Sequence, residues 1–481
     1  MKTSNCPSCG AQVQFKSAAS AIAVCSFCRG TVLRDGASVQ NMGKLSEILD
    51  DFSPIRLGTE GAWKTKRFTV MGRLRLKYGD GAWNEWSVEF RDGTLGWLSD
   101  ASGQFIVTRR VPAAKPPAPM DQLQVGRNLN VSGQKYVVSD ARKCVCIGGE
   151  GELPEPANDG KEFLSVDMRS VGGNGFITLD YSDDPPSVYA GEACARGDLG
   201  LSNLRPDDEI EQAAGKLKGG VTGFDCPSCG ASLEYHAGFG ETIACTFCKA
   251  VVALEGEKRT VVLKQDEIAQ RKPFIPLGTR GKLRGAAYDA IGFMSRSDDE
   301  GSEWEEYLLF STGRGFLWLT HAEDDWYLGE VLNGLPDDRG AQVYYGGKLY
   351  RQESEYPART TFVLGEFNWR VRIGDNVRVT EWSSGGSTLS REVYQEEITW
   401  TNSSKLTAAV IAASFGLPVP PQVRPETEST GARVPWPWVI AAWAGAFLLD
   451  GGAHLMGRGA FFALLVAALV LWLPKRFLEG E

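Results

Sequence analysis

Alternating apolar and polar residues mark most of the chain up to residue 406. Residues 68–71, 86–90 and 371–373 alternate in this way, and Gly, Asp and Asn turns separate such segments. A period of two residues predicts β-strands with one buried face. Helical spacing appears at 45–51 and 266–272, which both end before a proline, and a Pro-Asp-Asp signal opens 205–223. The pattern therefore predicts a mainly β protein with short connecting helices.

The pattern occurs twice along the chain. Four clustered cysteines recur 220 residues further on, as Cys6, Cys9, Cys25 and Cys28 and again as Cys226, Cys229, Cys245 and Cys248. A Leu-Gly-Thr motif at Leu57 recurs at Leu277 with the same offset. Three further residues recur at an offset of 221: Trp83 matches Trp304, Glu85 matches Glu306, and Trp97 matches Trp318. The chain is therefore a tandem repeat.

The offset between the copies shrinks further along. Gly151 and Glu152 match Gly365 and Glu366 at 214, and the Val-Tyr pair at Val188 matches the pair at Val393 at 205. A shrinking offset indicates that the second copy has shorter loops but keeps the strands. The long stretch between the two cysteine clusters is therefore a domain and not a linker.

Each cysteine cluster has the form C-x-x-C, fifteen intervening residues, then C-x-F-C. This spacing is typical of a zinc ribbon, in which two turns each point two thiolates at one ion. Such a short segment cannot bury enough apolar surface to fold alone, so the metal supplies folding free energy on the order of 10 kcal/mol. Four protein ligands leave no position for water, which predicts two structural Zn²⁺ sites. A disulfide or a redox dithiol is the alternative, and a reducing compartment disfavours it.

The expected layout follows from the repeat. We predict zinc ribbons at 1–36 and 224–256, β-rich domains at 53–204 and 273–406, and a helical linker at 205–223. Each β-rich domain is expected to be barrel-like or sandwich-like.

The last part of the chain has a different character. Residues 434–449 and 459–474 carry no charge, and 450–458 separate them. Within 434–476 we predict a transmembrane helical hairpin, preceded by a Pro-rich tether at 416–433. Basic residues flank both outer ends, which places those ends in the cytoplasm. Sixteen residues rise only about 24 Å, so a buried hairpin of a soluble domain is the alternative.

Composition and charge narrow the function. A chain of 481 residues is too long for one core, and 51 basic against 60 acidic residues give a net charge of −9. Nucleic acid is therefore an unlikely partner unless a ribbon provides a local basic patch. The first residues contain no apolar stretch typical of a secretory signal, so we expect the domains on the cytoplasmic side of a bacterial inner membrane.

Catalytic motifs are missing from the sequence. The three histidines have no histidine at the matching position of the other copy, and no phosphate-binding loop, nucleophile elbow or H-E-x-x-H occurs. Candidate ligand-binding residues are the glutamates that recur, Glu85 with Glu306, Glu152 with Glu366 and Glu192 with Glu397. An enzyme acting through these carboxylates is one hypothesis, and salt bridges or bonds to turn backbone are the structural alternative.

Tryptophans and the remaining cysteines have two interpretations each. Five tryptophans at strand positions either line a ligand groove or pack in a core, and the core is favoured: Trp83, Trp86, Trp97, Trp304 and Trp318. Cys144, Cys146 and Cys194 have no matching cysteine in the second copy. Buried strand thiols are favoured over a reactive pair.

Four features of the sequence carry a family resemblance. They are the ribbon cysteines, the Leu-Gly-Thr motifs at Leu57 and Leu277, the Gly-Glu turns at Gly151 and Gly365, and the Val-Tyr pairs. Together they resemble the bacterial domain of unknown function numbered 4178, in two tandem copies. The resemblance implies a zinc ribbon followed by a β-rich domain, and a gene context of membrane stress or polyamines, but no activity. The leading hypothesis is a membrane-anchored scaffold that binds a ligand or a protein partner; the alternatives are the carboxylate enzyme and nucleic-acid binding through the ribbons.

Overall fold

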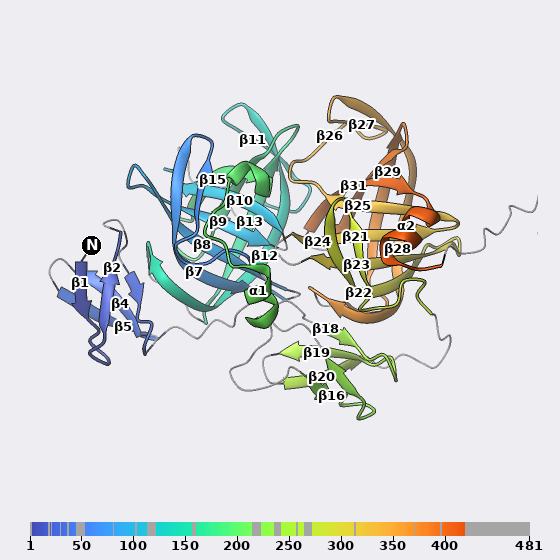
Figure 1. Ribbon diagram of the computed structural model, residues 1–481. Helices are drawn as coiled ribbons and strands as arrows, with labels where there is room; N and C mark the ends of the chain where they lie inside the picture. Colours follow the sequence, from blue (N-terminus) through green and yellow to red (C-terminus); the bar gives the residue numbers. More distant parts are fainter. Residues whose placement is uncertain are drawn as a thin grey trace, which may run out of the picture. The chain divides into compact units, whose positions relative to one another are not determined.

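The computed structural model describes residues 2–418, except 18–19, 21, 29, 36–37, 45–52, 80, 102, 113–121, 156–159, 214–222, 235–241, 256–257, 264–271, 312–313, 370 and 395–396 (Figure 1). The transmembrane hairpin expected at 434–476 lies outside the described residues. So do most of the tether and nearly all of the helices expected at 45–51 and 266–272. None of the helices in the described part of the chain is long and apolar enough to cross a bilayer.

The first repeat forms a closed barrel of eight antiparallel strands. Two meanders, β7 to β10 and β12 to β15, close the barrel because β7 pairs with β12 and β10 pairs with β15. The strands are β7 (Lys66–Lys77), β8 (Ala82–Phe90), β9 (Leu95–Ala101), β10 (Gln104–Arg110), β12 (Gln134–Leu153), β13 (Glu162–Ser170), β14 (Gly175–Asp180) and β15 (Ser187–Cys194). Two short strands, β6 (Glu60–Trp63) and β11 (Asn128–Val131), pair with β7 and β12.

The second repeat builds the same barrel, closed by the β22–β28 and β25–β31 pairs. Its strands are β22 (Ala286–Ser297), β23 (Glu303–Ser311), β24 (Gly315–Ala322), β25 (Asp325–Val331), β28 (Lys348–Phe367), β29 (Asn376–Ser384), β30 (Ser387–Tyr394) and β31 (Glu397–Leu406). Shorter strands are β21 (Arg280–Leu283), β26 (Asp337–Asp338) and β27 (Gln342–Tyr345). The fold is thus mainly β, as predicted, and the barrel alternative is the one observed.

Each ribbon is joined to the sheet of its own barrel. The first has β1 (Lys2–Asn5), β2 (Gln12–Phe15), β3 (Ile22–Val24), β4 (Gly30–Asp35) and β5 (Ser38–Lys44); the second has β16 (Gly223–Asp225), β17 (Ser232–Glu234), β18 (Thr242–Ala244), β19 (Val251–Glu255) and β20 (Lys258–Leu263). Strand β3 pairs with the end of β12, and β18 pairs with the end of β28. The ribbons therefore extend the barrels, and their last strands run beyond the limits of 36 and 256 expected from the sequence.

Gly151 and Gly365 are required where the barrels close. Both have positive φ, at +74° and +82°, and a Cβ there would lie 2.4 Å from the Met71 carbonyl oxygen and 2.3 Å from that of Ile291. Only glycine fits so tight an approach of β12 to β7, or of β28 to β22. This explains why the Gly-Glu motif recurs in both copies.

The apolar faces of the barrel strands point outward and are covered by other segments. Trp86, Val88 and Phe90 of β8 pack with Ile55 and with Leu199 of the 3-10 helix η2 (Arg196–Leu199). In the second repeat, helix α2 (Ala408–Phe415) provides the cover with Ile411 and Phe415. Helix α1 (Asp207–Ala213) opens the segment between the repeats. Because successive side chains alternate across a strand, the opposite faces turn to the barrel interior, where acids such as Glu85 lie beside apolar residues such as Leu76.

The register corrects the late part of the predicted alignment. Val188 lies in β15 but Val393 lies in β30, so this pair is not equivalent. In the first barrel Glu192 of β15 pairs with Val107 of β10. In the second barrel the matching strands are β31 and β25, where Ser404 pairs with Leu328. Glu192 therefore corresponds to Ser404, and the predicted match with Glu397 is wrong. The offset of 212 that relates Glu192 to Ser404 also relates Asp180 of β14 to Glu392 of β30, so the Val-Tyr match at an offset of 205 is a chance likeness.

Candidate functional site

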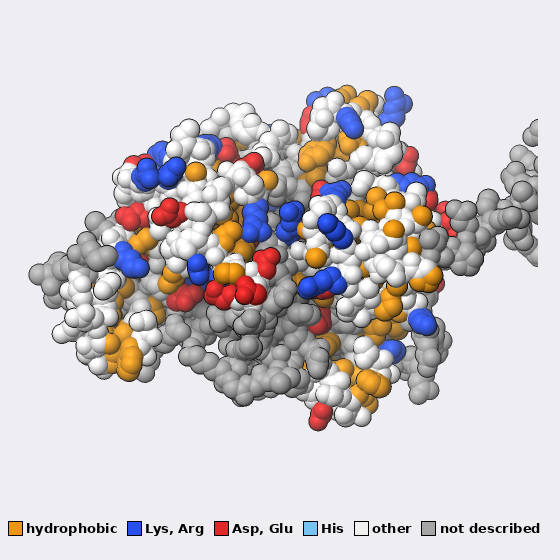
Figure 2. All heavy atoms as spheres, in the orientation of Figure 1, with side chains coloured by type: hydrophobic (Ala, Val, Ile, Leu, Met, Phe, Trp, Pro, Cys, Tyr) orange, Lys and Arg blue, Asp and Glu red, His pale blue; other side chains and the backbone are white. Residues whose placement is uncertain are grey.

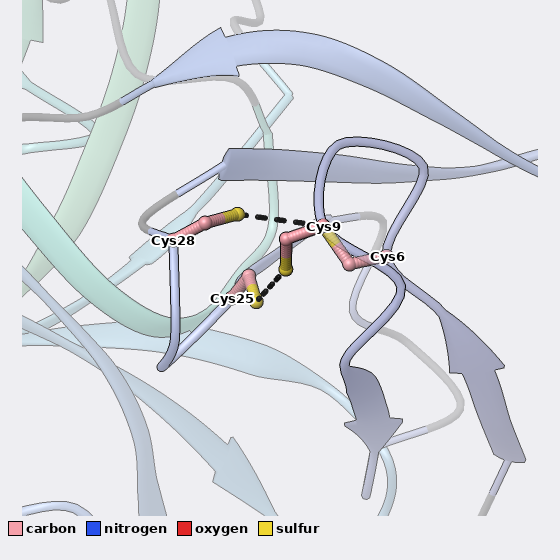
Figure 3. Close-up of side chains that lie close together, drawn as sticks. All are labelled: Cys6, Cys9, Cys25 and Cys28. Atoms are coloured by element: carbon pink, nitrogen blue, oxygen red, sulfur yellow. Dashed lines mark hydrogen bonds between the residues drawn. The ribbon is translucent and has the colours of Figure 1, made fainter.

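The two cysteine tetrads have the geometry of metal sites. In the first, the Cys6 and Cys28 sulfurs lie 3.6 Å apart and those of Cys9 and Cys25 3.8 Å apart (Figure 3). The second tetrad gives 3.7 and 3.8 Å for the matching pairs, and within each tetrad all four sulfurs lie within 4.8 Å of one another. A tetrahedral ion with metal–sulfur bonds of ~2.3 Å needs sulfur–sulfur edges of ~3.8 Å. Each tetrad can therefore hold one metal ion, and none of the eleven cysteines forms a disulfide.

The turns between the ribbon strands position the sulfurs. Cys6 and Cys9 lie in the turn from β1 to β2, and Cys25 and Cys28 in the turn from β3 to β4. Backbone N–H groups donate to the sulfurs, at 3.4 Å from Gly30 to Cys28 and 3.4 Å from Phe247 to Cys245. Such donors stabilise the thiolate form that a metal requires.

Glu152 joins the first ribbon to its barrel. Its buried carboxylate accepts hydrogen bonds from the Lys16 N–H at 2.7 Å and the Ser17 N–H at 3.0 Å. Glu366 is buried at the matching position of β28, opposite Ile243 of the second ribbon. These two glutamates, predicted as ligand-binding candidates, therefore lie at the junction of ribbon and barrel.

Both ribbons present a phenylalanine at the surface of the metal turn. Phe27 is 80% exposed and Phe247 is 72% exposed, and the two occupy matching positions of the C-x-F-C motifs. Figure 2 shows apolar side chains at the surface of both ribbons. Neither side chain belongs to an apolar cluster of the described residues, so both are candidate contact points for a partner.

The two barrels share one partly open cavity. It has a volume of about 1350 Å³ and is lined by apolar, aromatic and acidic side chains of both barrels. In the first barrel Glu85 accepts hydrogen bonds from the Trp83 indole N–H at 2.7 Å and from the Ser99 hydroxyl at 2.8 Å. In the second, Glu306 accepts from the Trp304 indole N–H, also at 2.7 Å. The Trp-x-Glu pair at Glu85 and Glu306 is thus an interior feature of both copies.

The register reveals two further interior acids that sequence comparison missed. In the first barrel Asp167 of β13 lies opposite Thr178 of β14. At the same position of the second barrel, Glu381 of β29 lies opposite Ser390 of β30. The Thr178 hydroxyl donates to Asp167 at 2.7 Å, and the Ser390 hydroxyl donates to Glu381 at 3.3 Å.

Asp180 and Glu392 form the third matching pair. Asp180 lies opposite Ser165, and Glu392 lies opposite Val379 at the same position of the second barrel. Both line the cavity, like the other two acid pairs. The pairs of Asp167 and Asp180 combine an Asp in the first copy with a Glu in the second, and the offset between the copies changes from strand to strand. A comparison of the two sequences therefore did not detect them.

The interior carboxyls sit in a low-dielectric environment. Burial raises the pKa of Glu85 to about 7, with a further increase from Asp167 and Asp100 that the Trp83 and Ser99 hydrogen bonds oppose. Burial also raises the pKa of Asp167 and of Glu381. Of these groups, Glu85 therefore changes its protonation state near neutral pH.

The tryptophans divide between cavity and core. Trp83, Trp97, Trp304 and Trp318 line the cavity. Trp86 instead is 1% exposed in the outer apolar cluster, with the Arg73 guanidinium 5.0 Å from its ring centroid. Trp97 also packs against the apolar cluster of Ile22, Val24 and Leu153, and Trp318 packs against a cluster that contains Leu308. The ligand-groove interpretation thus fits Trp83 and Trp304, the core interpretation fits Trp86, and Trp97 and Trp318 take part in both.

The recurring glutamates do not form one site. Glu85 faces the barrel interior, Glu152 lies at the ribbon junction, and Glu192 forms an ion pair with Lys64 at 2.8 Å near the surface. Glu397 lies 3.2 Å from the Arg142 guanidinium. A catalytic centre built from the three recurring glutamates is therefore not supported.

The remaining cysteines are buried thiols. The sulfurs of Cys144, Cys146 and Cys194 lie 3.5 to 3.6 Å from backbone carbonyl oxygens. Burial raises the pKa of Cys144 to about 12 and that of Cys194 to about 11. Such thiols are weak nucleophiles at neutral pH.

The family is decided by its sequence model. The "Domain of unknown function (DUF4178)" matches residues 56–196 and 276–408. The chain belongs to this family. Its two matches begin 220 residues apart and end 212 apart, which agrees with the corrected register of β15 and β31. The comparison with curated proteins gives no match.

Proposed function

We propose that this tandem DUF4178 protein is a binding protein without catalytic activity, in which the interior of a barrel holds a small ligand. The observation that carries the proposal is the duplicated interior set of three acids and two tryptophans per barrel. Eight-stranded barrels have an interior wide enough for one small ligand. Aromatic walls with a few placed polar groups are typical of such sites.

Native mass spectrometry of the full chain, purified gently from membranes or cytosol, tests this proposal. The folded protein should carry a small molecule that is released on acid unfolding, in addition to any metal. The double variant Glu85→Gln, Glu306→Gln should carry less of it, and the surface variant Glu192→Gln should carry as much as the wild type. Repeated recovery of a protein with metal alone would contradict the proposal.

We propose Zn²⁺ as the ion in both ribbons, with a structural role. Four thiolates at tetrahedral spacing suit zinc and leave no open position for a substrate. Its chemistry there is to hold the two turns together, and Cys6, Cys9, Cys25 and Cys28 would be its ligands in the first ribbon.

We further propose that residues 434–476 anchor the protein in the bacterial inner membrane, with the ribbons and barrels in the cytoplasm. Support comes from the two uncharged stretches and their flanking basic residues. Alkaline carbonate should leave the full chain in the membrane pellet and release a chain that ends at residue 418. Release of both would contradict the anchor.

A protein partner that contacts the ribbons is a second candidate function, favoured by the exposed Phe27 and Phe247. A photo-crosslinking residue in place of Phe27 should give one discrete adduct in cells, whereas the same residue in place of the exposed Gln134 should not. Identical patterns from both positions would exclude a specific contact there.

A further inference from the structure

The two barrels share their acids but differ at one interior position. In the second barrel this position is Arg296, opposite Trp304 on β23; in the first it is Leu76, opposite Trp83 on β8. The strands that close the two barrels give the same match. Arg296 lies opposite Thr360 of β28, and Leu76 lies opposite Cys146 at the matching position of β12. Both residues line the cavity. The copies can therefore be compared side chain by side chain.

Arg296 occupies the acid cluster of the second barrel. Its guanidinium Nη1 lies 3.2 Å from Glu306 and 3.0 Å from Glu392, and its side chain is 8% exposed. Burial by itself lowers the pKa of Arg296, but the charges of Glu306 and Glu392 outweigh it and raise the pKa above its ordinary value. The matching acids of this fold thus bind a guanidinium group when one is within reach.

The first barrel has the same acids with an apolar residue in place of that arginine. Glu85 and Asp180 match Glu306 and Glu392, and together with Asp167 they raise the pKa of the nearby Cys144 thiol, which burial alone already raises. Arg142 and Arg169 also line this interior. Burial raises the pKa of Asp167, and both arginines lower it. The ion pairs of Arg142 go to Asp140 and Glu397, and Arg169 donates to the Asn333 carbonyl oxygen at 2.7 Å, so neither arginine forms an ion pair with Glu85 or Asp180 among the described contacts. The place between Glu85 and Asp180 therefore has acids on its walls and Leu76 where Arg296 would stand.

We propose that the first barrel binds a small organic cation whose guanidinium or primary ammonium group takes the place that Arg296 occupies in the second barrel. This inference rests on the proposed ligand-binding function and names the ligand class and the barrel. The indoles of Trp83 and Trp97 line the same cavity and suit a cation through their ring faces. The second barrel is filled by its own arginine and does not bind the ligand.

Reciprocal exchange of the two residues tests the proposal on the full, metal-loaded chain. Titration calorimetry with n-butylguanidinium and n-butylammonium should show one site in the wild type, and uncharged n-butylurea should not bind. Leu76→Arg should weaken binding on the order of tenfold or more. The matched control Leu76→Met should keep the wild-type affinity.

Arg296→Leu should show a second binding site and a lower unfolding temperature, because Glu306 and Glu392 lose their partner. Millimolar n-butylguanidinium should restore that temperature and n-butylurea should not, a rescue that can be measured even if the variant is unstable. Equal binding of butylurea, or unchanged binding in Leu76→Arg, would overturn the inference. If native mass spectrometry still finds a retained small molecule, the broader ligand-binding proposal stands while this inference fails.

Discussion

At the scale of single residues, Glu85 is the most consequential carboxyl of the first barrel. Its pKa of about 7 in the folded state lies above its ordinary value of 4.5, because burial disfavours the charged form. The stability that the protonated form contributes is fully present below pH 4.5 and is lost as pH rises through 7.

Glu85→Gln should therefore flatten the pH dependence of stability. Urea unfolding between pH 5 and pH 8 should show a smaller loss of free energy in this variant than in the wild type, with a difference of about 1–3 kcal/mol. Glu192→Gln, at the surface beside Lys64, should follow the wild type. Parallel curves for Glu85→Gln and wild type would show that this carboxyl does not hold its proton in the folded state.

Gly151 makes a second prediction at this scale. An alanine there would have a strained φ and would clash with the Met71 carbonyl, so Gly151→Ala should cost more than ~2 kcal/mol of unfolding free energy. Gly93 has a similar φ of +77° with open space around it, and Gly93→Ala should cost only about 1 kcal/mol. Chemical denaturation of both variants checks the contrast, and equal losses would assign the effect to φ alone.

At the scale of elements, the ribbon and the barrel stabilise each other. Strand β3 extends the sheet at the end of β12, and Glu152 accepts two backbone N–H groups of the ribbon. Loss of a buried acceptor costs about 1–3 kcal/mol.

Removal of the metal by a chelator should therefore loosen the barrel edge as well as the ribbon. Hydrogen exchange of residues 148–153 should accelerate after chelation, whereas exchange in β10, whose apolar clusters contain no ribbon residue, should change little. Glu152→Gln should speed exchange at 148–153 even with metal present, and Glu155→Gln should not. Unchanged exchange after chelation would show that the two elements are independent.

At the scale of the whole molecule, the duplication predicts two independent metal sites. Elemental analysis should give two ions per chain for the wild type and one for either Cys9→Ser or Cys229→Ser. Cys144→Ser, a buried strand thiol outside the tetrads, should retain two. Fewer than two ions in the wild type would refute the ribbon assignment.

The two copies are also unequal as whole domains. Both keep the acids at the positions of Glu85, Asp167 and Asp180. In the second barrel Arg296 pairs with Glu306 and Glu392, whereas the arginines of the first barrel, Arg142 and Arg169, act on Asp167. The proposed cation site follows from this difference, with Leu76 in the first barrel where Arg296 stands in the second. Ligand binding by the whole chain is therefore expected at one barrel.

The sequence by itself determined the tandem repeat, the mainly β fold and the cysteine tetrads. These depend on local spacing, and a C-x-x-C turn or an alternating strand has the same form wherever it folds. Tertiary structure alone decided which acids face one another. Asp167 and Glu381 gave no signal, and Glu192 and Glu397 gave a misleading one, because equivalence in a closed barrel follows strand register, and loops of unequal length shift that register between copies.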